Sequence, residues 1–567
     1  MTDRRTAAAA ATAAARTVLT HARNTLLSSV ATVRGARHAV TEHEIPAKVS
    51  AAAHTWMAAN WTKIRSTAAA APRTWPAASR NKILAAAGLV ACALITMFVT
   101  AGDGGTLAGA AAGPAAAPGT GPIKADPGGT WPPAPADPAG SRTTTGGAPD
   151  PSHRAAPASA WCVRAFGINC YSPRQLQQAY DLPPLYARGL DGQGRTIVVV
   201  DAYGSPTIRH DLQVFDAGCG LPGPPSLRII QPVGRVPRYD ADDQDMVDAA
   251  AETTTDVEAA HSIAPGASIL LVETPADETL SGGGFAQFMA AENYVVRHGL
   301  GDVISQSFGL PEQNFGGQAS IRQLRYAFQN AARHQVTVLA AANDFGVTGP
   351  TRAGGGFRTQ PVVDWPASDP LVTGVGGTRL QLTATGRRTA PDSAWNEDGD
   401  AVVARYAGAL PWASSGGRSA VFTRPAYQGA VRGVTGGRRG VPDVALSASF
   451  RGGFLSYGSF TGRGAWKPAA GTSVATPMLA GLVAIADQDV HTRLGLINPA
   501  LYRLAQQHAP GIVTVTRGNN TVRVTQRGKT VTVHGYPARA GYSLVTGVGT
   551  VDAARFVPEL AAMASQP

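Results

Sequence analysis

Short, continuous apolar runs alternate with Ala-rich stretches of helical spacing over the second two thirds of the chain. A run of this kind is typical of a parallel strand that is covered on both faces. Its repeated alternation with helical stretches predicts an α/β fold with a parallel sheet, whose working groups gather at the carboxyl ends of the strands. The predicted strands are 196–201, 268–272, 303–305, 336–341 and 444–446.

The first 160 residues lack this pattern. They are rich in Ala, Pro, Gly, Thr and Arg, a composition that buries little apolar surface. Between 102 and 160, proline and glycine dominate and indicate a disordered, solvated spacer. We therefore expect four parts: a basic Ala-rich tail (1–82), a transmembrane segment (83–101), the spacer (102–160) and a folded domain (161–562).

Residues 83–101 form a 19-residue run without charge, which is long enough to cross a bilayer. Arg80 and Lys82 precede the run and Asp103 follows it, so the tail is expected in the cytoplasm and the folded domain outside. We favour a retained anchor, which predicts a single-pass protein of the cell membrane. The small residues at 99–101 leave the alternative of a protein secreted after cleavage near Ala101.

The net charge of +11 raises the question of an acidic partner such as nucleic acid. Residues 1–82 hold twelve Lys or Arg against three acidic residues and so carry +9 of the total. Membrane orientation explains a basic tail beside an apolar run. We therefore expect no nucleic-acid partner, while the tail remains able to bind acidic lipid.

Cysteine usage agrees with export of the folded domain. Cys92 lies in the apolar run, whereas Cys162, Cys170 and Cys219 follow it. Three cysteines allow one disulfide, as is common outside the cytoplasm. The sequence decides neither which two would pair nor whether all three stay free thiols.

Ser473 is a candidate nucleophile. It follows Gly471 and opens an almost wholly apolar helical stretch, so its hydroxyl would lie at the positive end of a buried helix dipole. Serine is also a favoured helix cap, and position alone favours that simpler role. The small residues on both sides would let a substrate backbone approach, which supports catalysis.

A serine nucleophile needs a base, and two sets of residues compete for that role. Glu252 and Asp256 are four residues apart in a predicted helix and so share one face, either as a catalytic pair or as a solvated acidic face. His261 with Asp201, at the end of the first strand, would instead give a conventional Ser-His-Asp set. A histidine in this position is otherwise a structural residue that binds a loop.

Asp344 follows the strand 336–341 and lies where a donor to an oxyanion would be needed. An ionised carboxylate would repel that oxygen, so Asp344 could serve only as a neutral acid. This requirement points to operation at low pH. The simpler alternative is an Asx turn before Gly346.

Together these segments resemble the sedolisin family, the serine-carboxyl peptidases, which have a subtilisin-like fold and use a glutamate in place of the histidine base. The resemblance covers about residues 175–559 and rests on the order and spacing of short motifs. It implies a doubly wound parallel sheet of the subtilisin type. Besides the segments already described, the motifs are 365–368, 374–378, 395–397, 415–417, 442–444 and 498–502.

The resemblance implies an acid-favouring serine endopeptidase that acts on proteins or peptides. Ser473 would attack the scissile carbonyl, Glu252 would take its proton, Asp256 would support Glu252, and Asp344 would donate to the oxyanion. The family's substrate-pairing strand matches 305–309, which makes the substrate-binding candidates Ser305, Ser307 and Gly309. In the related subtilisins an asparagine matches Asp344, so the aspartate favours the serine-carboxyl mechanism over His261.

The chain departs from the family pattern in three places. Asn343 replaces a usual glycine, and no folded pro-domain is recognisable before the peptidase domain. The family's calcium site uses two aspartates, which are replaced here by Thr514 and Ser543, so we expect no metal or other cofactor. A non-catalytic surface protein that keeps the peptidase fold for binding remains the alternative from another class.

Overall fold

A largely parallel sheet of eight strands forms the centre of the structure, as the apolar runs predict. The structure is a computed structural model and describes residues 155–526 and 528–564. The strand order is β3–β4–β2–β5–β7–β9, with β13 parallel and β10 antiparallel to β9. The strands are β2 (Thr196–Ala202), β3 (Leu227–Ile230), β4 (Ser268–Thr274), β5 (Val303–Gln306), β7 (Thr337–Ala341), β9 (Thr373–Arg379), β10 (Ser393–Ala394) and β13 (Val444–Ser447).

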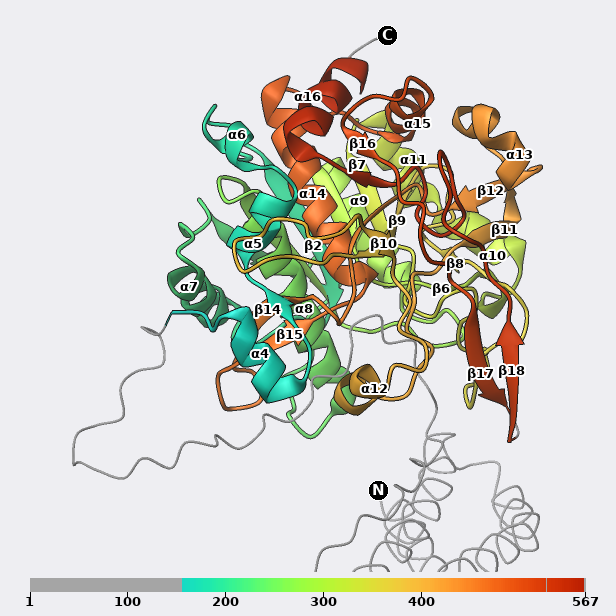
Figure 1. The fold of residues 1–567 in the computed structure, drawn as a ribbon, viewed down its shortest axis with the longest axis horizontal. Coiled ribbons are helices and arrows are strands. Elements are labelled where there is room, and N and C mark those ends of the chain that lie inside the picture. The colour runs from blue at the N-terminus through green and yellow to red at the C-terminus, as the bar shows by residue number, and fades with distance from the viewer. Residues whose placement is uncertain (1–154, 527, 565–567) are drawn as a thin grey trace, which may run out of the picture. The chain divides into compact units, whose positions relative to one another are not determined.

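Helices cover both faces of this sheet (Figure 1). Because side chains alternate along a strand, Val199 of β2 packs in one core cluster and its neighbours Val198 and Val200 pack in the other. The first cluster includes residues of α8 (Gln244–Ile263) and α14 (Thr472–Asp489), and the second includes residues of α9 (Phe285–Arg297) and α11 (Tyr326–Arg333). This burial on both faces explains why the strand sequences are continuously apolar.

The two helices α8 and α14 pack against each other, and a glycine permits their close approach. A Cβ atom at Gly481 of α14 would lie 2.7 Å from Cβ of Ile263 and 3.2 Å from the carbonyl oxygen of Ala260, both in the last turn of α8. A larger residue would force the helices apart. The contact therefore fixes the relative position of the two elements that carry the predicted nucleophile and base.

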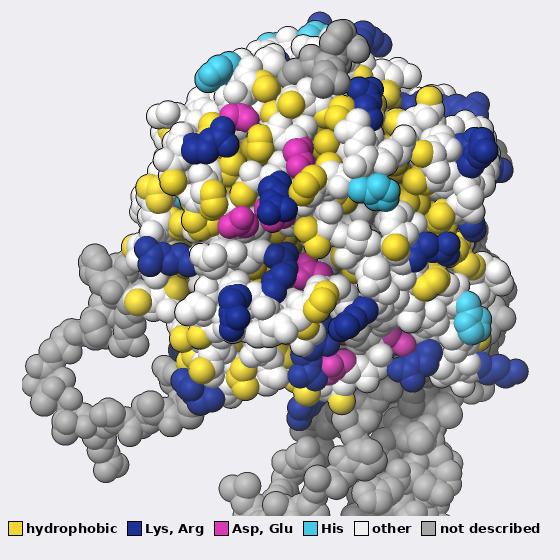
Figure 2. Space-filling view, turned by 45° about the horizontal axis from the view of Figure 1, so that its top comes forward, with side chains coloured by type: hydrophobic (Ala, Val, Ile, Leu, Met, Phe, Trp, Pro, Cys, Tyr) yellow, Lys and Arg dark blue, Asp and Glu magenta, His cyan; other side chains and the backbone are white. Residues whose placement is uncertain are grey.

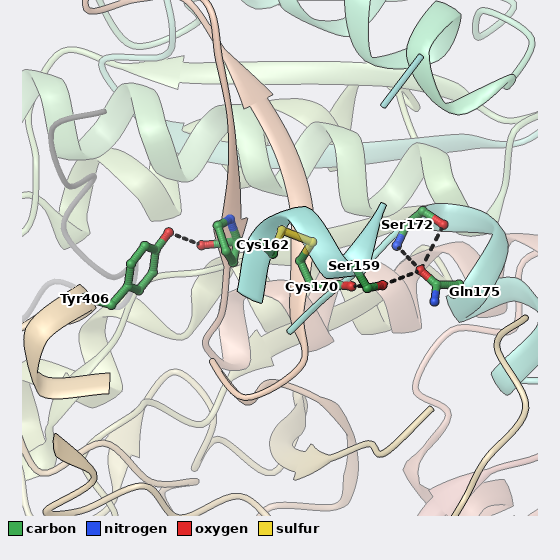
Figure 3. The surroundings of a disulfide bond; sticks show 7 residues. Ser159, Cys162, Cys170, Ser172, Gln175 and Tyr406 are labelled. Atoms are coloured by element: carbon green, nitrogen blue, oxygen red, sulfur yellow. Dashed lines mark hydrogen bonds between the residues drawn. A yellow bond between two sulfur atoms is a disulfide. The ribbon is translucent and has the colours of Figure 1, made fainter. Parts of the chain in front are cut away.

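A disulfide between Cys162 and Cys170 joins the first described helix, α4 (Ser159–Phe166), to β1 (Cys170–Tyr171). Figure 3 shows the bond beside Ser159, whose hydroxyl donates to the carbonyl oxygen of Cys170 at 2.6 Å. Strand β1 pairs with β14 (Gly453–Gly458), which in turn pairs with β15 (Ala465–Ala469). Cys219 is a buried free thiol, whose pKa is raised mainly by burial.

Smaller elements surround the sheet, and several of them belong to the carboxyl-terminal part of the chain. The helical ones are α5 (Pro173–Ala179), α6 (Pro183–Tyr186), α7 (Ile208–Cys219), α10 (Gln318–Leu324), α12 (Ala401–Ala407), α13 (Arg432–Thr435), α15 (Asn498–Gln506), α16 (Ala553–Ala564), η3 (Glu312–Asn314) and η4 (Ala426–Val431). The short strands pair as β6 (Leu310–Pro311) with β8 (Asp364–Trp365), β11 (Gly417–Thr423) with β12 (Arg438–Val441), β16 (Ile512–Val513) with β19 (Thr550–Val551), and β17 (Val522–Gln526) with β18 (Lys529–Val533).

The folded region begins earlier than the predicted boundary at residue 161. The amide of Ala156 already donates to the carbonyl of Gly218, and α4 begins at Ser159. At the other end, α16 continues to Ala564, two residues past the predicted end at 562. The Ala- and Pro-rich composition of 155–160 hid these contacts, which depend on distant partners.

The predicted tail, the membrane segment and the spacer up to residue 154 lie outside the described residues. Within the described part of the chain, no helix combines the length and the apolar character needed to cross a bilayer. Figure 2 shows one face of the folded region, on which Lys and Arg side chains are spread among hydrophobic and polar ones, with Asp and Glu between them.

Candidate active site

Ser473 is the second residue of α14, where the sequence predicts a helix start. Its neighbour Gly471 has φ 123°, a conformation that other residues rarely adopt, so the chain can turn sharply into the helix. Helix α14 lies against β5, β7, β9 and β13, and Ser473 is 1% exposed. The hydroxyl is thus held at the end of a buried helix, close to the carboxyl ends of the sheet strands.

Glu252 and Asp256 lie one turn apart on α8, as their spacing predicts. Asp256 is fully buried and accepts a hydrogen bond from the Ser307 hydroxyl at 2.7 Å. Burial raises the pKa of Asp256 well above its usual range, and the negative charges of Asp201 and Glu252 raise it further. Glu252 is only partly buried and is thus the more exposed carboxyl of the pair.

Asp201 adds a third carboxyl to this pair. It lies at the end of β2 and is 4% exposed. Burial raises its pKa to about 7, helped by the charges of Glu273 and Asp277. Sequence reasoning considered Asp201 only as a partner of His261, whereas the structure places it near Asp256.

Asp344 lies just after β7 and is bound to the residue that precedes the candidate nucleophile. The backbone amide and the hydroxyl of Thr472 both donate to Oδ1 of Asp344, each at 2.8 Å. Its other oxygen, Oδ2, is buried and has no hydrogen-bond partner among the described residues. Burial raises the pKa of Asp344 to about 7, although the two bonds from Thr472 lower it. A carboxyl in this state is a proton donor in mildly acidic solution.

Three residues have contacts in this site that the sequence did not predict. Thr472 anchors Asp344, Asn343 donates through its amide to Asp364, and Asp364 is a further buried carboxyl. Burial raises the pKa of Asp364 to about 8. The position of Thr472 directly before Ser473 was a usable signal, whereas nothing in the local sequence links Asp364 to the site.

His261 faces away from Glu252, which argues against a Ser-His-Asp set. Its Nε2 atom lies 2.8 Å from the carbonyl of Pro222 and 3.2 Å from Oδ1 of Asp216 on α7. The side chain is fully buried there. This is the structural role that the sequence left open for the histidine.

The three substrate-binding candidates occupy different positions relative to the sheet. Ser305 lies inside β5, where its backbone is paired with β2 on one side and β7 on the other. Ser307 and Gly309 follow the end of β5 at Gln306. A substrate strand could therefore pair only with the segment beyond residue 306.

The positions that match the family's calcium ligands carry hydroxyl side chains in place of carboxylates. Ser543 is 1% exposed, and its hydroxyl lies 2.8 Å from that of Thr546 and accepts from the Thr546 amide at 3.1 Å. Thr514 follows β16 and likewise offers no carboxylate. Over residues 155–526 and 528–564, no group of three or more His, Cys, Asp or Glu side chains is placed to hold a metal ion.

Comparison with known proteins places this geometry in context. The model of the subtilase family matches residues 246–505. Kumamolisin from a Bacillus species is 31% identical over 405 residues, which cover 70% of this chain and 64% of kumamolisin. Sedolisin from a Pseudomonas species is 29% identical over 361 residues, which cover 64% of this chain and 57% of sedolisin. The chain thus spans about three fifths of the length of these relatives.

Among solved structures, Pseudomonas sedolisin, a serine-carboxyl proteinase complexed with two molecules of pseudo-iodotyrostatin, matches with a TM-score of 0.57. It is 26% identical, and the match covers 69% of this chain and 97% of that structure. The sheet, its helices and the central serine define a protein with the subtilisin-like α/β fold. Within that fold, the chain is similar to sedolisin, whose structure is that of a serine-carboxyl proteinase, and to kumamolisin.

Proposed function

We propose that the protein is a serine endopeptidase of the serine-carboxyl type, which hydrolyses proteins or peptides in acidic surroundings. The observation that carries this proposal is the state of Asp344, a buried carboxyl with one oxygen held by Thr472 and the other without a partner among the described residues. Such a group can donate a hydrogen bond to an oxyanion only while it is protonated. Its pKa of about 7 allows this below neutral pH.

In the proposed mechanism, Oγ of Ser473 attacks the scissile carbonyl carbon while Glu252 takes the hydroxyl proton. As negative charge forms on the carbonyl oxygen, the protonated carboxyl of Asp344 donates a hydrogen bond to that oxygen. Glu252 then passes its proton to the leaving amine, which breaks the peptide bond and leaves an acyl group on Ser473. Water then attacks the acyl carbon while Glu252 takes its proton, and Glu252 returns that proton to Oγ of Ser473 as the acyl–oxygen bond breaks.

Asp256 supports Glu252 in this scheme, since it lies one turn away on α8 and burial raises its pKa, which favours a neutral Asp256 beside an ionised Glu252. The hydrogen bond from Ser307 fixes the orientation of Asp256 and links it to the segment 307–309. That segment is the proposed site of substrate pairing, with Ser307 and Gly309 as its named members. Ser305 is left out of the proposed site because both sides of its strand are already paired.

We also propose that the peptidase domain works outside the cytoplasm, tethered by residues 83–101, or secreted if the chain is cut near Ala101. The disulfide between Cys162 and Cys170 supports an oxidising compartment. Digestion of intact cells by an added protease would test the location, because only a domain outside the cell would be cut. A peptidase domain found on the cytoplasmic side would contradict the proposed location.

The catalytic proposal is tested by hydrolysis of an internally quenched peptide, blocked at both ends, between pH 3 and 8. We expect Ser473→Ala and Glu252→Gln to lose nearly all activity, and His261→Ala to keep its pH profile with reduced stability, since His261 binds α7 and not the site. Activity that survives Glu252→Gln but not His261→Ala would favour the subtilisin-type mechanism. Failure of a peptide aldehyde to label Ser473 in the wild type would favour the non-catalytic binding protein.

A further inference from the structure

Asn343 occupies a conformation that a side chain rarely adopts. Its φ is 86°, in the left-handed region where glycine is the usual residue. It is nevertheless 3% exposed and fully surrounded by the elements of the proposed site. A strained residue of this kind persists when its surroundings hold it in place, so its side-chain contacts need an explanation.

The side-chain amide of Asn343 bonds to three separate parts of the site. Its Oδ1 accepts from the backbone amide of Asp344 at 2.6 Å. Its Nδ2 donates to the carboxylate of Asp364 in β8 and, at 3.4 Å, to the carbonyl oxygen of Gly309. One amide group thus joins the proposed oxyanion donor, a buried acid and the proposed substrate-pairing segment.

The backbone of the same residue is also engaged. The Asn343 amide donates to Oγ1 of Thr472 at 3.1 Å, and its carbonyl accepts from the amide of Ser415 at 2.9 Å. Thr472 in turn holds Oδ1 of Asp344. A glycine could keep these backbone bonds, but it would lose every bond that the side chain makes.

We propose that Asn343 is a positioning residue for the reaction, whose amide fixes the loop of Asp344 against Asp364 and Gly309 so that the Asp344 carboxyl is aimed at the developing oxyanion. This inference rests on the proposed function. A hydrogen-bond donor stabilises a transition state best when it is already held in position. A displacement of its loop by a fraction of an ångström therefore weakens stabilisation of the transition state more than it weakens binding of the substrate.

The test compares Asn343→Gly with the wild type in kcat, KM and inhibition by a peptide aldehyde, whose adduct oxygen occupies the oxyanion position. Loss of a complete oxyanion donor costs about 10²–10³ in kcat, so a loosened donor should cost less. We expect kcat to fall about tenfold and the inhibition constant to rise by a similar factor, with KM within about twofold. Glycine suits the backbone conformation, which offsets part of the stability lost with the side-chain bonds, so kcat and the inhibition constant are compared well below the Tm of both proteins.

Asn330→Ala provides a matched control, because Asn330 is another buried asparagine whose amide bonds only to Asn293 among the described residues. It should lower Tm and leave kcat and the inhibition constant unchanged. A second variant, Asp364→Ala, removes the oxygen that accepts the bond from the Asn343 amide. If the two residues act through their shared bond, the double variant with Asn343→Gly should lose no more activity than the worse single variant.

An Asn343→Gly protein with wild-type kcat and wild-type aldehyde affinity would overturn the inference, and so would a rise in KM alone. Additive losses in the double variant would also overturn the part assigned to Asp364. A wild type that neither cleaves peptides nor binds the aldehyde would refute the proposed function itself. That result is distinguishable because it appears before any variant is made.

Discussion

Replacing Asp344 by asparagine should make the protein more stable at neutral pH, although it alters a group of the proposed active site. Asp344 is fully buried, and burial raises its pKa to about 7, whereas an aspartate in an unfolded chain titrates near about 3.9. The difference of about 3 pKa units corresponds to about 4 kcal/mol, at about 1.4 kcal/mol per unit. Asparagine has the same shape and carries no proton to lose.

The sign of the effect follows from which state holds the proton. Below about pH 4 the carboxyl is neutral in both states and does not favour unfolding. Between about pH 4 and pH 7 it ionises in the unfolded chain but not in the folded protein, so stability falls as the pH rises through the folded pKa. Above that pKa the loss stays constant. Asp344→Asn should lack this part of the pH dependence.

The variant keeps an oxygen that can accept both bonds from Thr472, and its amide can donate to an oxyanion at any pH. We therefore expect weaker activity near pH 5 but an alkaline limit that moves above pH 7. Asp344→Ala, which has no donor, should lose about 10²–10³ in kcat below pH 7, where the wild type keeps the Asp344 proton. The comparison separates loss of the donor from loss of its titration.

The assay is urea unfolding of wild type and Asp344→Asn at pH 4, 5.5, 7 and 8, with the peptidase pH profile measured in parallel. Buried carboxyls that do not interact with Asp344 contribute equally to both proteins, and the charge of Asp344 is only a minor cause of the raised pKa of Asp364, so the quantity of interest is the difference between the two unfolding free energies. It should be near zero at pH 4 and grow to at most about 4 kcal/mol at pH 8. A difference that is the same at all four pH values would refute the reasoning.

Three further predictions concern the scaffold. Asp443→Asn leaves the buried guanidinium of Arg439 without its charged partner and should lower the unfolding free energy in urea by about 3–5 kcal/mol. Asp489→Asn, which breaks the more exposed ion pair with Arg188, is the control and should have little effect. Cys162→Ser removes the disulfide that closes a short loop and should lower the unfolding free energy by up to about 2–3 kcal/mol. Cys219→Ser, which changes a thiol outside any disulfide, is the comparison, and equal losses in both variants would contradict a role for the disulfide. A chelator should leave Tm unchanged, because the matching positions offer no carboxylates, and a drop of several degrees would reveal a cation site.

The sheet could be predicted from the sequence because its strands are buried on both faces. The runs at 196–201, 268–272 and 336–341 are continuously apolar for that reason, and each appears as a strand of the sheet. Helix α8 could also be predicted, since Ala-rich spacing and the pair Glu252 and Asp256 both follow its period. Local pattern and tertiary burial agree in these elements.

The orientation of His261 was also contained in the sequence. Nine residues separate it from Glu252, which is two and a half turns of an α-helix, so the two side chains point to opposite sides. The structure agrees, because His261 contacts Pro222 and Asp216 near α7. Helical geometry alone therefore favoured a glutamate base if the face of Glu252 meets Ser473.

Contacts between single side chains from distant segments could not be predicted. Asp344 and Thr472 are 128 residues apart, and Asn343 and Asp364 are 21 apart. Neither pair leaves a periodic signal in the chain. The choice of Cys162 and Cys170 as the bonded pair has the same character, since three cysteines fit several pairings and only the fold brings two of them together.

The acids of the site are not paired with arginine or lysine. Among the described residues, Asp256 accepts from the Ser307 hydroxyl and Asp344 accepts from the amide and hydroxyl of Thr472, and neither acid forms a salt bridge. A cation would lower their pKa values and keep them ionised, as Arg451 does for Asp400. Neutral donors leave burial as the dominant influence, so these acids hold their protons up to an unusually high pH.

Buried acids outside the site also have raised pKa values, so the stability of the fold and the proposed chemistry depend on pH in the same direction. Burial raises the pKa of Asp487 to about 8 and those of Glu258 and Glu292 well above their usual range, although the proposed mechanism uses none of the three. Each of these acids makes the folded state lose stability as the pH rises above about 4. Acidic surroundings would therefore protonate the Asp344 donor and stabilise the domain that holds it, so a pH optimum for activity below 7 should coincide with the range of greatest stability.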